Sequence, residues 1–151
     1  MNTWINRQKC LVCNRDVIMV GFLSQIKKMI VEKTIPILRI FDYEKAIEFY
    51  IDWLGFAIQW EHVFDEGMPV YMEVFKDGLT LHLSEHHGDA TPGAKVFLWC
   101  TGLKEYHKML IEKKYKNNQP GMDETFYGSW AVEVIDPFGN RLSFNEKKAG
   151  K

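Results

Sequence analysis

From residue 34 onward, hydrophobic and polar positions follow two different periods along the chain. Residues 34–41 (TIPILRIF) alternate with a period of two, which predicts a strand. Asp42 then offers an N-cap, and apolar residues recur at helical spacing at Tyr43, Ile47, Tyr50 and Leu54. Gly55 follows as a residue suited to the left-handed end of a helix. The pattern therefore predicts a strand followed by one amphipathic helix.

Three further strands are predicted after this helix, over residues 56–64, 70–75 and 79–84. The last two are separated by Lys76, Asp77 and Gly78, a sequence typical of a tight hairpin turn. The order of elements in this half of the chain is thus βαβββ.

The second half follows the same plan. A strand is predicted over residues 94–100, a helix over 103–115, a loop over 117–123, and strands over 130–135 and 141–145. Asp42 matches Gly102 and Glu73 matches Glu133 at an offset of 60, and His82 matches Ser143 at an offset of 61. Such matches in register indicate an internal duplication. We therefore predict an α+β fold of two tandem βαβββ modules, over about residues 33–87 and 93–146.

The strands also predict two different faces, because successive side chains of a strand point to opposite sides of a sheet. One parity is apolar and is expected to pack against the helices: Pro36, Leu38, Ile40, Leu79, Leu81, Leu83, Val96, Leu98, Cys100, Leu142 and Phe144. The other parity is polar and aromatic: Ile35, Ile37, Arg39, Thr80, His82, Ser84, Lys95, Phe97, Trp99, Arg141, Ser143 and Asn145. A face of this kind is either solvated or lines a cup. Phe97 and Trp99 favour the cup, since a solvated face has little use for large aromatic side chains.

Residues 1–32 form an amino-terminal extension without this patterning, and residues 147–151 form a short tail. The pair Cys10 and Cys13 lacks a second ligand pair for zinc and a βαβ context for redox chemistry, so we interpret both as unpaired thiols. The apolar run 17–23 is too short to span a bilayer. The order of this extension stays open at this stage.

Composition and charge narrow the function classes. The chain has 151 residues, 46% of them hydrophobic and 26% charged, which is typical of a globular protein. A formal net charge of −1, with no basic stripe, argues against nucleic acid as a partner. Three cysteines without a scaffold spacing favour a reduced, cytoplasmic setting, and no membrane association is expected.

Several motifs in the right order resemble one family. The runs AIEFYIDWLGF, LHLSE and DPFGNRLSF resemble the glyoxalase, bleomycin-resistance protein and extradiol dioxygenase superfamily. The stretches HLSEHHGDATPGAKVFLWCTGL and DPFGNRLSFNE are most similar to bleomycin-resistance-type proteins. The resemblance covers about residues 33–146. It implies a cupped eight-stranded mixed sheet with the helices on its outer face, and a homodimer that completes each pocket.

The resemblance also implies where a metal would be held. Metalloenzymes of this superfamily place His or Glu on the first and last strands of each module, positions that fall here on Ile35, His82, Lys95 and Ser143. The single imidazole of His82 does not make a metal site, because catalytic metals generally need about three protein ligands. We therefore expect no metal site, no cofactor and no catalytic residues.

The resemblance and the aromatic pattern together predict a metal-free protein that sequesters a bleomycin-type glycopeptide antibiotic or another small planar aromatic molecule. The candidate binding residues are Trp60, His62, Phe64, His82, Ser84, Lys95, Phe97, Trp99, Tyr127, Trp130 and Arg141. Arg39, Lys95 and Arg141 leave an anionic aromatic ligand open as a variant. Two alternatives also stay open: a metal-dependent lyase, isomerase or dioxygenase with atypical ligands, and a regulatory module without a small ligand.

Overall fold

The computed structural model describes residues 29–116 and 118–148. The chain divides after Lys33, and the fold is that of the second unit, which begins at Thr34. Most of the predicted extension, including Cys10, Cys13 and the run 17–23, lies outside the described residues, as do residues 149–151.

The first module contains β1 (Ile37–Arg39), the helical pair α1 (Tyr43–Ala46) and η1 (Ile47–Trp53), and the strands β2 (Ala57–Val63), β3 (Val70–Lys76) and β4 (Leu79–Ser84). These strands form a mixed sheet in the order β1-β4-β3-β2, in which β1 is parallel to β4. Asp42 caps α1, because its side chain accepts a hydrogen bond of 3.0 Å from the backbone of Lys45. The turn between β3 and β4 holds Asp77 and Gly78 at positive φ, as the predicted hairpin requires.

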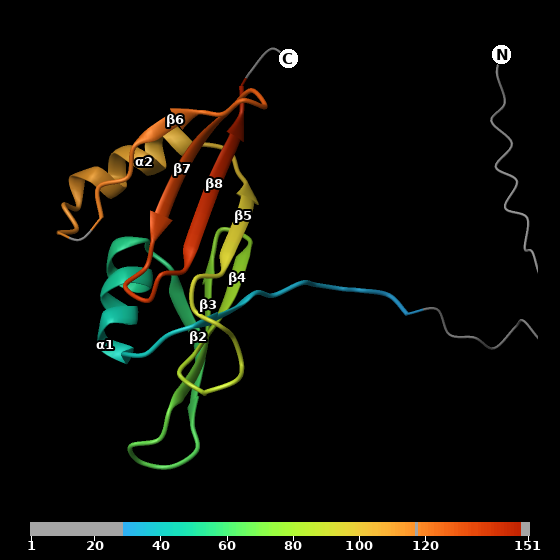
Figure 1. Cartoon of the computed structure of the whole chain (residues 1–151), viewed down its shortest axis with the longest axis vertical. Coiled ribbons are helices and arrows are strands. Elements are labelled where there is room, and N and C mark those ends of the chain that lie inside the picture. Colours follow the sequence, from blue (N-terminus) through green and yellow to red (C-terminus); the bar gives the residue numbers. More distant parts are fainter. Residues whose placement is uncertain (1–28, 117, 149–151) are drawn as a thin grey trace, which may run out of the picture. The chain divides into compact units, whose positions relative to one another are not determined.

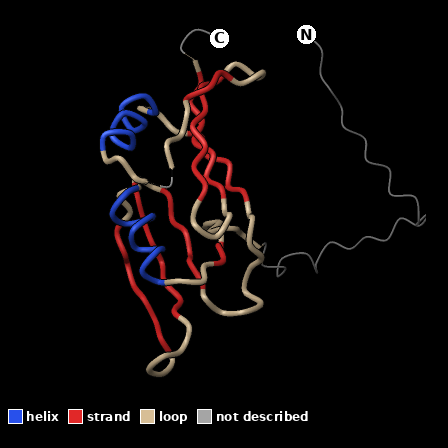
Figure 2. Tube along the Cα trace, turned by 60° about the vertical axis from the view of Figure 1, so that its left-hand side comes forward, coloured by secondary structure: helices blue, strands red, loops and turns tan. Residues whose placement is uncertain are grey.

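The second module repeats this arrangement. It contains β5 (Lys95–Trp99), α2 (Leu103–Glu112), β6 (Met122–Glu124), β7 (Ser129–Ile135) and β8 (Arg141–Lys147). Its sheet has the order β5-β8-β7-β6, with β5 parallel to β8. The identical strand order confirms the α+β fold with two βαβββ modules. The eight strands form two four-stranded sheets rather than one continuous sheet, and Figure 2 shows the two groups of strands with the helices beside them.

Several element boundaries differ from those predicted. The segment 34–41 is a strand only from Ile37 to Arg39, although the hydrogen bond from His82 N to Pro36 O extends its alignment with β4. The helix predicted over 103–115 ends at Glu112, because Lys114 has a φ of 51° and Tyr115 turns back to stack on Trp53, 4.9 Å away. The predicted loop 117–123 contains the start of β6, and the predicted tail begins with Lys147, the last residue of β8.

The apolar parity predicted from the sequence forms the core. Leu38, Ile40, Leu81, Leu83 and Leu142 are fully buried, together with the helix residues that cover them. In Figure 1, α1 lies beside the first sheet and α2 beside β7. The longest helix among the described residues has ten residues, and none of the described helices is both long and apolar enough to cross a membrane.

Buried polar contacts join the two modules. The Tyr50 hydroxyl donates to the Asp136 carboxylate at 2.7 Å, and the Trp53 indole donates to the Leu110 carbonyl at 3.0 Å. The Tyr106 hydroxyl donates to the Leu54 carbonyl at 2.9 Å. These bonds link the helical segment of the first module to the second module.

Candidate ligand-binding surfaces

The second module carries an aromatic cluster on the face of its sheet away from α2. Phe97 and Trp99 alternate on β5 and lie edge to face, with ring centroids 5.2 Å apart. Tyr127, in the turn before β7, lies 6.3 Å from both rings. Phe97 is 48% exposed and Trp99 is 54% exposed, which is high for large aromatic side chains on a sheet. We call this surface, completed by the charged residues described next, the second-module face.

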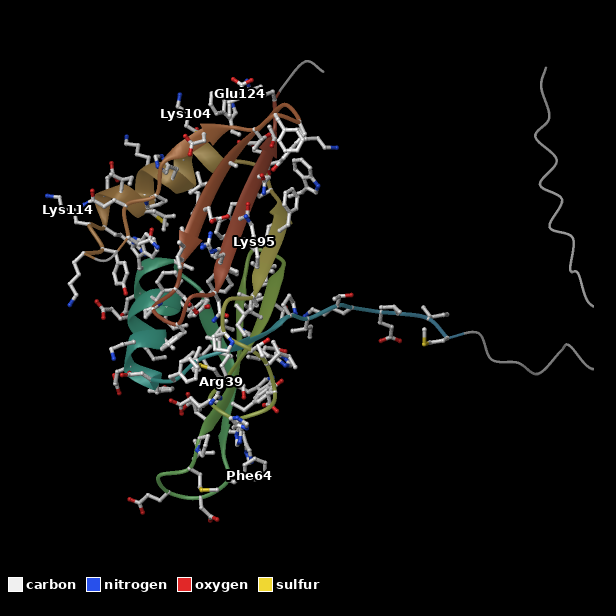
Figure 3. All side chains as sticks on the ribbon, viewed as in Figure 1. Arg39, Phe64, Lys95, Lys104, Lys114 and Glu124 are labelled. Carbon is white, nitrogen blue, oxygen red and sulfur yellow. The ribbon has the colours of Figure 1, made fainter. Side chains whose placement is uncertain are left out.

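Three charged side chains continue this face at the start of β5. Glu133 on β7 forms ion pairs with Lys95 at 2.5 Å and with Arg141 at 3.1 Å. The hydrogen bond from Lys95 is the main reason why the pKa of the Glu133 carboxyl lies below its ordinary value. Two cations and one anion leave this cluster with a charge of +1. Figure 3 shows Lys95 on this sheet.

Beneath the aromatic cluster, polar groups hold the sheet and Tyr127 in place. The buried Asn145 accepts a hydrogen bond of 2.9 Å from the Tyr127 hydroxyl. Its amide nitrogen donates to the Ser143 carbonyl at 2.9 Å and to the Ser143 hydroxyl at 3.1 Å. Ser143, the register partner of Phe97, is itself buried, so it supports the sheet beneath the rings and offers little surface to a ligand.

The first module presents a different face, built around His82 on β4. The Tyr71 hydroxyl lies 2.8 Å from His82 Nδ1, and His82 Nε2 lies 2.9 Å from a Glu73 carboxylate oxygen. Trp60 stacks on Tyr71 at 5.8 Å with nearly parallel rings and meets His82 edge to face. We call this surface the first-module face. Glu73 and Glu133, which are equivalent in the duplication, are therefore both paired with basic side chains of their own module.

Three other predicted residues lie near the far end of β2. His62 meets Phe64 at 4.6 Å, and Phe64 meets His86 at 5.6 Å (Phe64 is labelled in Figure 3). Ser84, also predicted as a binding residue, is fully buried. Its hydroxyl donates to Asp89 at 2.6 Å and accepts from the backbone of His86 at 3.0 Å. Ser84 thus fixes the loop after β4 and offers no surface to a ligand.

Trp130 lies apart from the other predicted aromatic residues. On β7, Trp130 points to the same face as Val132 and Val134, because the three residues are two positions apart. Both valines are buried, so Trp130 belongs to the helix side of the sheet. Its ring lies 4.6 Å from the Lys148 ammonium, which forms a cation–π contact. The structure therefore does not bring Trp130 together with Phe97 and Trp99.

At the four positions where metalloenzymes of the superfamily hold a metal, the side chains of this chain are not suited to binding a metal ion. Ile35 has no donor atom, Lys95 is ion-paired with Glu133, and the Ser143 hydroxyl already accepts from Asn145. His82 has both ring nitrogens in hydrogen bonds to the protein. Within residues 29–116 and 118–148, no group of three His, Cys, Asp or Glu side chains could hold a metal ion. These residues do not fit a catalytic metal.

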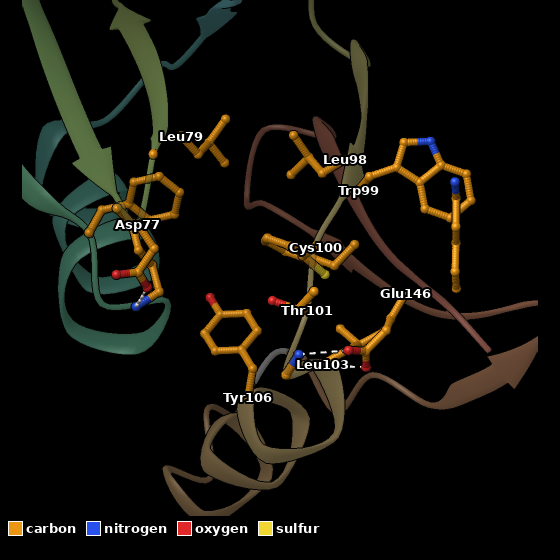
Figure 4. Close-up of a pocket in the computed structure, with 15 residues that line it drawn as sticks. Asp77, Leu79, Leu98, Trp99, Cys100, Thr101, Leu103, Tyr106 and Glu146 are labelled. Carbon is orange, nitrogen blue, oxygen red and sulfur yellow. Dashed lines mark hydrogen bonds and ion pairs between the residues drawn. The ribbon is translucent and has the colours of Figure 1, made fainter. Parts of the chain in front are cut away.

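A cleft of about 950 Å³ opens between the β3–β4 turn and the start of α2, and Trp99 of the second-module face lines one side of it beside Lys147, whose ammonium lies 5.4 Å from the Trp99 ring (Figure 4). Leu79, Leu98 and Cys100 line it from the apolar parity, since neither helix covers them fully. Several of its polar groups already have partners: Glu146 accepts from Gly102 N at 2.7 Å and Leu103 N at 3.1 Å, and Lys76 pairs with Asp77. Few of its polar groups are left to orient a ligand, so we place the candidate site on the aromatic faces instead.

The sequence prediction missed Tyr71, which stacks on Trp60 and bonds to His82. Alternation along β3 could have found it, because Tyr71 and Glu73 share one parity while Val70, Met72 and Val74 are buried on the other. Asn145 was placed on the polar parity, but its role beneath Tyr127 depends on a contact between separate strands, which alternation does not reveal.

Comparison with known families gives one match over most of the chain. Residues 22–151 match a family model described as "Glyoxalase superfamily protein". No curated protein matches the chain.

Solved structures share the fold at low identity. A bleomycin-binding protein complexed with bleomycin is 20% identical, with a TM-score of 0.59 over 78% of this chain and 100% of its own. A bleomycin resistance determinant encoded on the transposon Tn5 is also 20% identical, with a TM-score of 0.60 over 78% of this chain and 99% of its own. TnmS3, an antibiotic binding protein from Streptomyces sp. CB03234, has a TM-score of 0.63 at 20% identity, over 80% of this chain and 100% of its own.

Proposed function

Because the chain belongs to the glyoxalase superfamily, we propose that it is one of the members that bind a small molecule without turning it over. The ligand is a planar aromatic molecule, and a bleomycin-type antibiotic is one candidate. The observation that carries this proposal is the exposed aromatic second-module face, where the ring centroids of Phe97, Trp99 and Tyr127 lie 5.2 to 6.3 Å apart.

The energetics of an aromatic wall support a planar ligand. Aromatic pairs contribute roughly 0.5–1.5 kcal/mol beyond the burial of their area. The ring planes of Phe97 and Trp99 meet at 78°, so a flat ligand over β5 can stack on one ring and meet the other edge to face. The hydrogen bond from Tyr127 to Asn145 holds the third ring in place before a ligand arrives, which lowers the entropy lost on binding. Three solved structures with the same fold are of proteins named for binding or resisting antibiotics.

The absence of turnover is proposed from the residue types at the four inward positions. Ile35, His82, Lys95 and Ser143 do not make a metal site, and a metal acting as a Lewis acid underlies the chemistry of the metalloenzymes of the superfamily. A binding role also needs no further reactive group on the aromatic face.

We further propose that the working form is a homodimer. β1 and β5 are edge strands, each paired on one side only among the described strands. The aromatic side chains beside them are half exposed in the single chain. A face of one chain that covers a face of the partner would enclose a ligand between two aromatic walls. Light scattering of the purified protein tests this point, and a monomer at micromolar concentration would contradict it.

Equilibrium dialysis followed by chromatography tests the proposed function. Metal-free bleomycin and a panel of planar aromatic compounds are dialysed against the protein, and each compound is then recovered and analysed. Saturable retention of a compound that is recovered unchanged supports the proposal. Conversion of a retained compound to a product, or retention of none of them, would contradict it.

A further inference from the structure

The two aromatic faces differ in charge, and the difference bears on the kind of ligand that the second-module face accepts. In the first module, the basic partner of Glu73 is His82, and burial together with the nearby charge of Asp89 raises the pKa of Tyr71. In the second module, the partners of Glu133 are Lys95 and Arg141, both permanently charged at neutral pH and each about half exposed. The duplication has therefore kept the central carboxylate and surrounds it with two cations in the second module, in place of one imidazole in the first.

The two cations are able to hold a ligand and Glu133 at the same time. Arg141 contacts Glu133 through Nη1, and a guanidinium has five N–H donors, so it can keep this bond and still donate to an acid group. The Lys95 ammonium has three donors, of which the Glu133 carboxylate takes one.

The spacing along β5 sets the shape of the ligand. Lys95, Phe97 and Trp99 project from the same side of the strand at successive steps of about 7 Å. An acid group at Lys95 and Arg141 therefore places an attached ring system over Phe97 and toward Trp99. A ligand with its acid group directly on, or one atom away from, a fused ring fits this order.

We propose that the second-module face selects planar aromatic carboxylates, with the carboxylate held by Lys95 and Arg141 and the ring against Phe97 and Trp99. This inference rests on the proposed function and adds the charge and orientation of the ligand. It disfavours cationic ligands, such as glycopeptides of the bleomycin type, at this face.

Isothermal titration with three probes of matched shape tests the inference: 2-naphthoate, 2-naphthamide and 2-naphthylmethylammonium. The affinity is expected to be highest for naphthoate, lower for naphthamide and lowest for the ammonium compound. Naphthoate should bind about tenfold more tightly than the amide, because its carboxylate accepts charge-assisted hydrogen bonds. The naphthoate affinity falls with added salt, and that of the amide does not. Equal affinities, or preference for the ammonium, would overturn the inference and leave the proposed binding function in place. If none of the three probes binds, both are overturned.

Variants that change the charge of the Lys95–Glu133–Arg141 cluster test whether this cluster causes the preference for a carboxylate. The wild-type cluster has a charge of +1, from Lys95 and Arg141 against Glu133. Lys95→Gln lowers this charge to zero and is expected to remove the preference for naphthoate over naphthamide, whereas Glu133→Gln raises it to +2 and strengthens that preference. Each variant keeps a hydrogen-bonding partner in place, so the fold is preserved.

Lys104→Gln is the matched control, since it makes the same change at an exposed position of α2, the helix on the other side of the sheet (labelled in Figure 3). It should leave the preference unchanged. A loss of preference in the control as large as in Lys95→Gln would show that the overall charge of the chain acts, and would overturn the assignment to this face.

Discussion

Replacement of Tyr50 by Phe tests the buried contact that joins the two modules. The Tyr50 side chain is fully buried, and its hydroxyl donates to Asp136 at 2.7 Å. Hydrogen bonds to charged groups contribute about 1.5–3 kcal/mol, so we expect Tyr50→Phe to lower the free energy of unfolding by about 2 kcal/mol. Urea denaturation followed by circular dichroism measures this difference. The slope with denaturant should stay unchanged.

The dependence of this loss on pH follows from Asp136. Burial raises the pKa of the Asp136 carboxyl, and the hydrogen bond from Tyr50 acts in the opposite direction. A pKa raised by folding means that stability falls as the pH rises from the ordinary carboxyl value through the folded one. Without the Tyr50 hydroxyl the pKa rises further, so the loss in Tyr50→Phe should be larger at pH 7 than at pH 3.5.

Tyr43→Phe is a matched control, because it removes the same atom from the same helical segment. Its hydroxyl donates to Glu61 at 3.0 Å at an exposed position, where such a bond contributes little. We expect a loss below about 0.5 kcal/mol at both pH values. If the two variants lost equal stability, or if the Tyr50→Phe loss were independent of pH, the role given to the Tyr50–Asp136 bond would be refuted.

Three further outcomes are expected. Trp99→Ala should weaken the binding of a planar aromatic ligand about tenfold in a calorimetric titration, because a stacking partner is lost. Trp130→Ala, on the helix side of the sheet, should leave the affinity unchanged. Equal effects of the two variants would refute the assignment of the two residues to different faces. The pKa of Glu133 is lowered, so its ion pairs stabilise the fold above the ordinary carboxyl pKa, and this stabilisation is lost as the pH falls through the pKa of the folded state. The difference in unfolding midpoint between Glu133→Gln and wild type should therefore shrink from pH 6 to pH 3. A difference that stays constant would contradict this role of the ion pairs. Glu146→Ala should lower stability by about 1 kcal/mol in thermal unfolding, because its carboxylate caps the backbone of Gly102 and Leu103 at the start of α2, and an unchanged melting temperature would show that this cap does not contribute.

The periodicity of the chain was sufficient to predict the elements whose form depends on local sequence. The strand and helix patterns of both halves, the caps at Asp42 and Gly55 and the hairpin at Asp77 all appear in the structure. The duplication predicted the identical strand order of the two sheets, since two copies of one module bury their apolar parity in the same way.

Features that depend on contacts between distant residues were harder to predict. The helix after Leu103 ends early because Tyr115 stacks on Trp53 of the other module, a gain that helical spacing does not encode. Ser84 has the parity of a binding residue, but the short loop after β4 uses its hydroxyl internally. Trp130 was predicted as a binding residue together with Tyr127, although the alternation along β7 assigns its ring to the helix side.

The sequence predicted which residues form the candidate site better than it predicted the contacts between them. Alternation along β5 identified Lys95, Phe97 and Trp99 as one surface, and the structure places them so. The ion pairs of Glu133 were not predicted, because they join three strands whose neighbours are fixed only by the sheet order.

Tryptophan fluorescence during titration with planar aromatic ligands tests the central claim most directly. Trp99 is half exposed on the second-module face, and Trp60 is similarly exposed on the first-module face. The account predicts saturable quenching with about one ligand bound per chain, reduced in a Trp99→Phe variant, and ligand recovered unchanged. A titration without saturable quenching across anionic, neutral and cationic compounds would contradict the claim that these aromatic faces form a ligand-binding site.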